Sequence, residues 1–147
     1  MPATSKAGTE TVLVVSPSLN RALSGILEGA SRPLAVLHSP DCGQALAHLA
    51  DSSISVVICE TLLPDGSWKD LLACMARAEA SSVLVVTSKV ADEWLWAEVL
   101  NLGGYDVLAK PLDREEVRRS LQLAWQHNAL RVDVARTAQP VRRWAAS

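Results

Sequence analysis

The chain has 147 residues and a mass of 15.8 kDa, the size of one domain. Hydrophobic residues make up 49% and charged residues 20%, which supplies a core and excludes a wholly disordered chain. No apolar run approaches the ~18 residues that a membrane helix needs, and residues 1–10 lack the apolar segment of a secretory signal. We therefore expect one cytoplasmic domain that makes no contact with a membrane.

The cysteines and the charge exclude further classes. Three cysteines, Cys42, Cys59 and Cys74, are an odd number without C-x-x-C spacing, which is typical of a reducing compartment. Cys59, within an apolar run, is predicted to be a buried hydrophobe, and Asp41 beside Cys42 opposes a lowered thiol pKa. His38 and Cys42 are too few ligands for zinc, so no metal site is expected. A net charge of −2 excludes a strongly basic nucleic-acid-binding protein.

Five apolar runs of strand length recur along the chain. They are continuous β-branched or aliphatic runs rather than alternating ones, which is typical of strands covered on both faces of a sheet. The predicted strands are Thr11–Val15, Leu34–His38, Ile54–Glu60, Val83–Thr87 and Tyr105–Ala109.

Segments with the apolar spacing and the end signals of amphipathic helices follow these runs. The first and fourth are predicted to end at glycine, while the second and fifth begin with a capping aspartate. The signals are Leu23, Leu27 and Gly29 in the first helix, Asp41 and Leu49 in the second, Leu71 and Met75 in the third, Val99 and Gly103-Gly104 in the fourth, and Asp113, Glu116 and Leu121 in the fifth.

The alternation of strand and helix predicts an α/β fold, a five-stranded parallel sheet with right-handed crossovers and helices on both faces. We expect residues 1–10 to be a flexible tail, 11–130 to be the domain and 131–147 to be a C-terminal extension. The last helix either continues through Gln139 and docks on a second copy or a partner, or it ends near Asn128. The basic residues of this extension are sparse, so a solvated tail is favoured over nucleic-acid binding.

Polar residues follow the apolar runs at the edge where such sheets place their functional loops. Glu60, Thr87 and Lys110 come from three different strands and would meet there if the central strands adjoin. We predict that Glu60 and Lys110 lie within salt-bridge distance, with Thr87 close by. As an ordinary, partly exposed ion pair they would contribute about 0–1 kcal/mol.

The order of TVLVV, ICETLLPDG, VLVVTS and LGGYDVLAKP resembles the receiver domain of bacterial two-component response regulators over roughly residues 11–130. Its most specific pieces are Leu102-Gly103-Gly104 followed by Lys110-Pro111, and Glu60 followed four residues later by Pro64. The resemblance implies a flavodoxin-like sheet and a signalling role in which an aspartate takes a phosphoryl group with Mg²⁺ bound. It also implies a cis peptide bond between Lys110 and Pro111.

The sequence departs from this family where the metal and the phosphoryl group would bind. Ser16 and Pro17 stand in place of two adjacent acids that hold Mg²⁺, and Glu60 stands in place of the phosphorylated aspartate. Lys110 and Thr87 match the lysine and the hydroxyl that contact the phosphoryl group. One carboxylate, already paired, binds a hard hydrated ion poorly, and without the ion the transferring charge is not neutralised. The sequence therefore predicts a pseudo-receiver that is not an enzyme and uses no cofactor or metal.

Aromatic residues in the second half of the chain indicate a surface for partners. Val107 stands at the family's aromatic switch position, and Tyr105, two residues earlier, is expected on the same side of the strand as a substitute. Trp94 and Trp96 are about 200° apart on a helix, so at least one must be exposed. The resemblance implies that this side of the domain binds partners and sister subunits. We predict an interface that includes Trp94, Trp96 and Leu100.

The leading hypothesis is a stand-alone, phosphorylation-independent adaptor that binds a histidine kinase or a downstream effector and forms a homodimer. Two alternatives stay open. One is a phosphorelay receiver that is phosphorylated at an atypical site. The other is a pseudo-receiver that senses a small ligand bound beside Ser16, Glu60 and Lys110.

Overall fold

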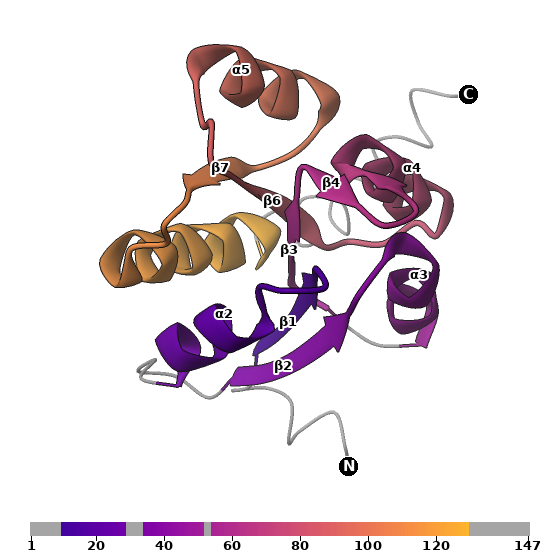
Figure 1. The fold of residues 1–147 in the computed structure, drawn as a ribbon. Helices are drawn as coiled ribbons and strands as arrows, with labels where there is room; N and C mark the ends of the chain where they lie inside the picture. The colour runs from indigo at the N-terminus through magenta and orange to yellow at the C-terminus, as the bar shows by residue number, and fades with distance from the viewer. Residues whose placement is uncertain (1–9, 29–33, 52–53, 130–147) are drawn as a thin grey trace, which may run out of the picture.

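The computed structural model describes residues 10–28, 34–51 and 54–129. Within these residues five parallel strands form one sheet in the order β2-β1-β3-β6-β7, as the sequence predicts (Figure 1). The third strand begins at Val56 rather than Ile54 and the last at Asp106 rather than Tyr105, within the usual uncertainty of element ends. The strands are β1 (Glu10–Val15), β2 (Leu34–Ser39), β3 (Val56–Glu60), β6 (Val83–Ser88) and β7 (Asp106–Ala109).

Five helices connect or follow these strands. They are α2 (Asn20–Leu27), α3 (Cys42–Asp51), α4 (Trp68–Arg77), α5 (Glu93–Leu102) and a C-terminal helix that occupies residues 114–129. Both predicted aspartate caps are confirmed, because Asp41 accepts the Gln44 N–H at 2.9 Å and Asp113 accepts the Glu116 N–H at 3.0 Å. The predicted stop at Gly29 and the extension over 131–147 lie outside the described residues. Among the described helices, none is long and apolar enough to cross a membrane.

The sheet is the middle of three layers (Figure 1). Along β1, Val12 and Val14 pack against α2 and the C-terminal helix, whereas Leu13 and Val15 pack against α3, α4 and α5. All four side chains are fully buried, which explains why this strand is apolar throughout rather than alternating. Burial of each such side chain contributes about 1.5–3 kcal/mol, so the two helical layers hold the sheet rigidly under its functional edge.

Two glycines turn the chain from α5 into β7. Gly103 adopts a φ of +107°, the left-handed region that glycine enters without a Cβ clash, and its N–H bonds to the last turn of α5. Gly104 donates its N–H to Val99 O at 2.7 Å, and a Cβ at this position would collide with the Val99 side chain. This close turn sets where β7 begins and therefore where Lys110 arrives at the sheet edge.

The structure adds a small hairpin that the sequence pattern did not predict. Strands β4 (Leu62–Leu63) and β5 (Gly66–Ser67) pair antiparallel directly after β3. The carboxylate of Asp65, between them, accepts the Cys42 N–H at 2.9 Å and the Gly43 N–H at 3.0 Å. These bonds satisfy amides in the first turn of α3 and tie the loop after β3 to that helix.

Candidate functional site at the carboxyl edge of the sheet

The sheet order places the predicted site residues beside one another. β1 and β3 are neighbours at the point where the chain reverses its direction across the sheet, a common location for functional sites in such folds. Ser16 follows β1 and Glu60 ends β3, while Thr87 on β6 is paired in register with Glu60. Lys110 follows β7 and donates its backbone N–H to Ser88 O at 2.9 Å. Four segments therefore converge at one edge.

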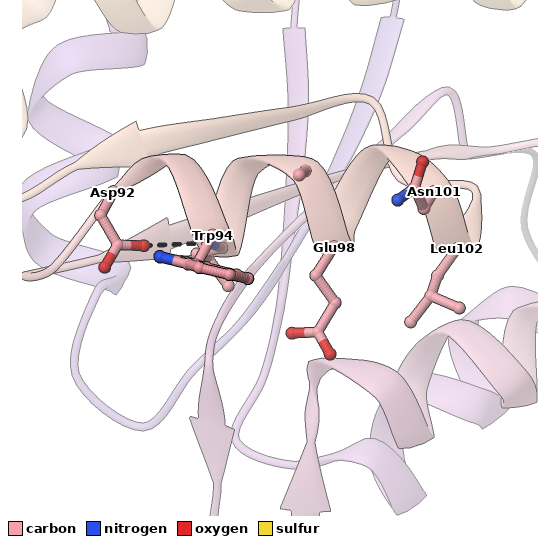
Figure 2. Close-up of a pocket in the computed structure, with 7 residues that line it drawn as sticks. Asp92, Trp94, Glu98, Asn101 and Leu102 are labelled. Atoms are coloured by element: carbon pink, nitrogen blue, oxygen red, sulfur yellow. Dashed lines mark hydrogen bonds between the residues drawn. The ribbon is translucent and has the colours of Figure 1, made fainter.

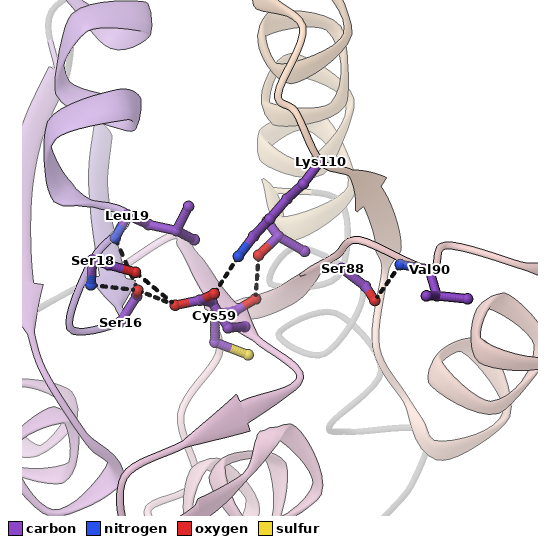
Figure 3. Close-up of polar contacts among 9 residues, drawn as sticks. Ser16, Ser18, Leu19, Cys59, Ser88, Val90 and Lys110 are labelled. Carbon is purple, nitrogen blue, oxygen red and sulfur yellow. Dashed lines mark hydrogen bonds and ion pairs between the residues drawn. The ribbon is translucent and has the colours of Figure 1, made fainter.

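Both carboxylate oxygens of Glu60 are engaged in bonds within the protein. Lys110 Nζ donates to Oε1 and Ser16 Oγ donates to Oε2, so the predicted ion pair is present in the structure. Ser18 Oγ lies 3.4 Å from the same Oε2. Figure 3 shows Ser16 and Ser18 approaching from the loop after β1 and Lys110 approaching from the other side. The Lys110 and Glu60 side chains are only 20% and 17% exposed, so water screens the pair weakly.

Ser16 connects this carboxylate to helix α2. Its side chain is fully buried, and its oxygen accepts the Ser18 N–H at 3.0 Å and the Leu19 N–H at 2.9 Å. A hydroxyl offers one proton and two lone pairs, so one donated and two accepted bonds use its whole capacity. The sequence marked Ser16 as a neutral residue at a metal-ligand position, but it gave no signal that this hydroxyl would both bond Glu60 and stabilise the chain entering α2.

These contacts keep Glu60 ionised. Partial burial by itself raises the pKa of the carboxyl group, because burial disfavours the charged form. Hydrogen bonds from Lys110 and Ser16, together with the charge of Lys110, outweigh that effect, and the pKa of Glu60 is lowered below its ordinary value of 4.5. At neutral pH the site therefore holds a carboxylate and an ammonium that neutralise each other.

Thr87 lies beside the Glu60–Lys110 ion pair and lines a pocket with these two residues, but it does not bond to them. Its side chain is fully buried, and Oγ1 donates to the backbone oxygen of Cys59 at 3.2 Å. With Glu60 and Lys110 it lines a pocket of about 340 Å³, whose rim includes Lys89 and Val90. On this rim Ser88 Oγ accepts the Val90 N–H at 3.0 Å (Figure 3).

The donor atoms at this edge do not suit Mg²⁺, which prefers several carboxylate oxygens in near-octahedral geometry. Pro17 offers no polar side-chain atom, the Ser16 hydroxyl is fully used, and both oxygens of Glu60 are taken. Within the described part of the chain, no three His, Cys, Asp or Glu residues lie close enough together to hold a metal ion. The residues at this edge therefore do not fit a Mg²⁺ ion.

Two further predictions concern the segment around β7. The peptide bond between Lys110 and Pro111 is cis in the structure. The expectation that Tyr105 and Val107 lie on the same side is wrong, because Tyr105 packs with the α2 layer and Val107 with the opposite layer. Tyr105 precedes β7, so the two-residue alternation of a strand does not extend to it. Its ring instead lies 5.0 Å from the ring of His127 on the C-terminal helix.

The cysteines near the site are buried thiols. Burial is the main cause that raises the pKa of Cys59, which is fully buried beside Glu60. Burial, followed by the charge of Asp65, raises the pKa of Cys42 to about 12. Both groups are protonated at neutral pH, so neither has the thiolate character of a redox-sensitive cysteine.

The aromatic residues of α5 lie on its outer surface. Trp94 is 86% exposed and Trp96 is 51% exposed, while Leu100 is 36% exposed. Helical geometry required only one exposed tryptophan, but both side chains reach solvent because Val99 alone of this helix is buried in the core. Exposed tryptophans are costly in water and typical of surfaces that bind other molecules.

Comparison with known proteins gives structural rather than sequence matches. No family model and no curated protein matches the sequence. The structure is similar to the signal receiver domain of an HD domain-containing protein from Pseudomonas fluorescens Pf-5, with a TM-score of 0.77, 25% identity and coverage of 86% of this chain and 94% of that one. A CheY-like response regulator receiver domain protein from Methanospirillum hungatei JF-1 matches with a TM-score of 0.70 at 16% identity, covering 84% and 98%.

A two-component response regulator from Clostridium difficile matches with a TM-score of 0.69 at 18% identity, covering 80% of this chain and 96% of that one. In all three cases nearly the whole length of the solved chain is covered, so the likeness extends over a complete domain. The resemblance that the sequence motifs indicate is thereby confirmed, and the chain has the fold of a response regulator receiver domain.

Proposed function

We propose that this protein is a receiver-like signalling adaptor that works without phosphorylation at Glu60 and is not an enzyme. Its likeness to response regulator receiver domains supports a role in signal transduction. The observation that carries the finer proposal is the closed network at the sheet edge, in which Lys110 and Ser16 occupy both oxygens of Glu60. Such a site is already neutralised and bonded before any ligand arrives.

Chemistry supports the same conclusion. Transfer of a phosphoryl group needs a free oxygen as nucleophile and a cation that neutralises the charge developing on the group. At this edge both carboxylate oxygens of Glu60 are hydrogen-bonded, and the Lys110 ammonium is already paired with Glu60. Glutamate also extends one methylene further than aspartate, so its carboxylate meets Lys110 directly. We infer that Glu60, with its single negative charge held against Lys110, permanently imitates a contact that a phosphorylated aspartate would make.

A domain with a permanently formed Glu60–Lys110 contact would act by binding another protein. Trp96 and Leu100 are four residues apart on α5, so they lie on the same face of the helix, and both are exposed. Exposed tryptophan is enriched at the centres of protein interfaces, and Leu100 adds apolar area beside it. We propose that this face binds a kinase or effector of a two-component pathway, or a second copy of the chain.

The pocket of about 340 Å³ above Glu60 favours one alternative, a pseudo-receiver that senses a small ligand. Lys89 is exposed at its rim and Thr61 also lines it, so a small anionic molecule would find a cation and a hydroxyl there. In this alternative the α5 face still binds the partner, and a small ligand provides the signal.

Incubation of the intact protein with acetyl phosphate and Mg²⁺ tests the proposal. A receiver domain that has both the acidic pair and the aspartate is treated in the same way as a positive control. We expect the mass of this protein to stay unchanged, and Glu60→Asp alone to stay unlabelled because the metal ligands are still missing. An added phosphoryl group on the wild type would overturn the proposal. A raised melting temperature without a mass change would instead support the small-ligand alternative.

A further inference from the structure

Helix α5 carries a groove on the side away from Trp96 and Leu100. Its volume is about 600 Å³, and Trp94, Glu98 and Leu102, spaced four residues apart, line it along one face of the helix. Figure 2 shows these three side chains projecting from the same side of α5. Because Trp94 and Trp96 are about 200° apart around the helix, this groove is a second surface, separate from the proposed partner face.

The groove combines apolar area with negative charge. Trp94 is 86% exposed and Leu102 is 52% exposed, while Asp92 and Glu98 place carboxylates along the same face. Lys69 of α4 lies 2.6 Å from Glu98, so one of the two acids has a cation beside it. An exposed indole flanked by carboxylates suits arginine, whose planar guanidinium stacks on the ring and bonds to an acid at its edge.

The chain itself contains a segment of that chemistry. Residues 130–147 include four arginines and one aspartate, a net charge of +3, together with Trp144. The rest of the chain must then carry −5, given the total of −2, so attraction between the two parts is expected. Within the segment, Arg142, Arg143 and Trp144 are adjacent and combine two guanidinium groups with an aromatic ring.

The geometry allows the same chain to supply this segment. The His127 ring lies 5.0 Å from the Tyr105 ring, and Tyr105 is three residues beyond Leu102, so the end of the described C-terminal helix is near the end of α5. The thirteen residues from 130 to Arg142 can span up to roughly 45 Å, whereas α5 with its ten residues is only about 15 Å long. The arginines can therefore reach any part of the groove.

We propose that the acidic groove of α5 binds the Arg142-Arg143-Trp144 part of its own chain. The bound segment covers Trp94, whose exposure would otherwise be unfavourable, and leaves Trp96 and Leu100 free for a partner. This contact does not depend on the ionisation or modification of Glu60, so it stands or falls independently of the proposed function.

Paramagnetic relaxation in the full-length chain tests this contact. A nitroxide is attached at Ser147→Cys in a Cys74→Ala background, where the two remaining cysteines are buried. We expect the backbone signals of Glu98 and Leu102 to broaden strongly and those of Gln44 on α3 to stay sharp. Raising the salt to about 1 M shortens the screening length to roughly 3 Å and should largely remove the broadening.

Matched variants show which charges are responsible. Glu98→Gln and the pair Arg142→Glu and Arg143→Glu should each reduce the broadening, while Glu93→Gln, which removes a charge from α5 outside the groove, should leave it unchanged. Equal broadening in every variant, or none in the wild type, would overturn the proposal. The remaining control mixes isotope-labelled chains that carry no nitroxide with nitroxide-labelled chains that carry no isotope label. Broadening in this mixture would mean that a second copy supplies the segment, which would also overturn the proposal.

Discussion

The carboxyl edge of the sheet and the surface of α5 differ in how their side chains are satisfied. At the sheet edge, Glu60 is bonded through both oxygens and Ser16 uses its whole hydrogen-bonding capacity inside the domain. On α5, Trp94 and Trp96 are exposed and have no comparable cover among the described residues. The charged groups at the sheet edge are satisfied by bonds within the domain, whereas the apolar side chains of α5 are open to contact with another molecule. This contrast supports the proposed role as an adaptor.

Two ion pairs make the same contrast measurable. Lys110 and Glu60 are 20% and 17% exposed, whereas Lys69 and Glu98 are 51% and 45% exposed. Coulomb attraction grows and screening falls as water is removed, but an unpaired charge also becomes more costly there. Burial rather than distance should therefore decide how much each ion pair contributes to the free energy of unfolding.

The largest effect is expected when Lys110 is replaced. Lys110→Met leaves the mostly buried carboxylate of Glu60 without its cation, and we expect the free energy of unfolding to fall by about 2–3 kcal/mol. Urea denaturation at neutral pH measures this from the midpoint at constant slope. The double variant with Glu60→Gln should recover part of the loss, because it removes the stranded charge.

The pH dependence of stability tests whether the stability lost in Lys110→Met comes from an ionised Glu60. Because its pKa is lowered in the folded protein, its contribution is complete above the ordinary value of 4.5 and disappears as the pH falls through the lowered pKa. The wild type should be more stable than Glu60→Gln at pH 7, and the difference should shrink below about pH 4.5. A difference that stays constant down to low pH would contradict an ionised, hydrogen-bonded Glu60.

A smaller effect is expected for the exposed pair between α4 and α5. Lys69→Met removes a contact that solvent already screens, so the free energy of unfolding should change by about 0–1 kcal/mol. The same urea titration serves as the measurement and as the control for Lys110→Met. If both lysine variants lost equal stability, burial would not be what distinguishes the two regions.

The smallest effect on stability is expected on the open surface itself. Trp96→Ala removes a half-exposed side chain and should change the unfolding free energy by no more than about 0.5 kcal/mol. If its face binds a second copy, sedimentation should show weaker self-association than in the wild type. Leu123→Ala, an exposed apolar residue on the C-terminal helix, is the control, and equal sedimentation of all three proteins would count against an interface at Trp96.

Most of the fold could be predicted from local signals. Continuous apolar runs indicated strands buried on both faces, and Asp41, Asp113 and Gly103 marked helix ends because these three caps involve only residues close by in the sequence. The hairpin of β4 and β5 escaped prediction because its two strands are two residues each, too short for a periodic pattern. Tyr105 was placed on the wrong side because it lies before β7, where the two-residue alternation of a strand no longer applies.

The sequence by itself determined which groups could meet at the sheet edge: a glutamate, a lysine and a serine in place of an acidic pair. Only the tertiary structure decided how they are used, since the Ser16–Glu60 and Lys110–Glu60 contacts join residues 44 and 50 positions apart. Likewise, Asp65 stabilises α3 from 22 and 23 residues away, a cap that no local motif encodes. Composition and spacing limit the available chemistry, but hydrogen bonds between distant segments form only when the strand order brings them together.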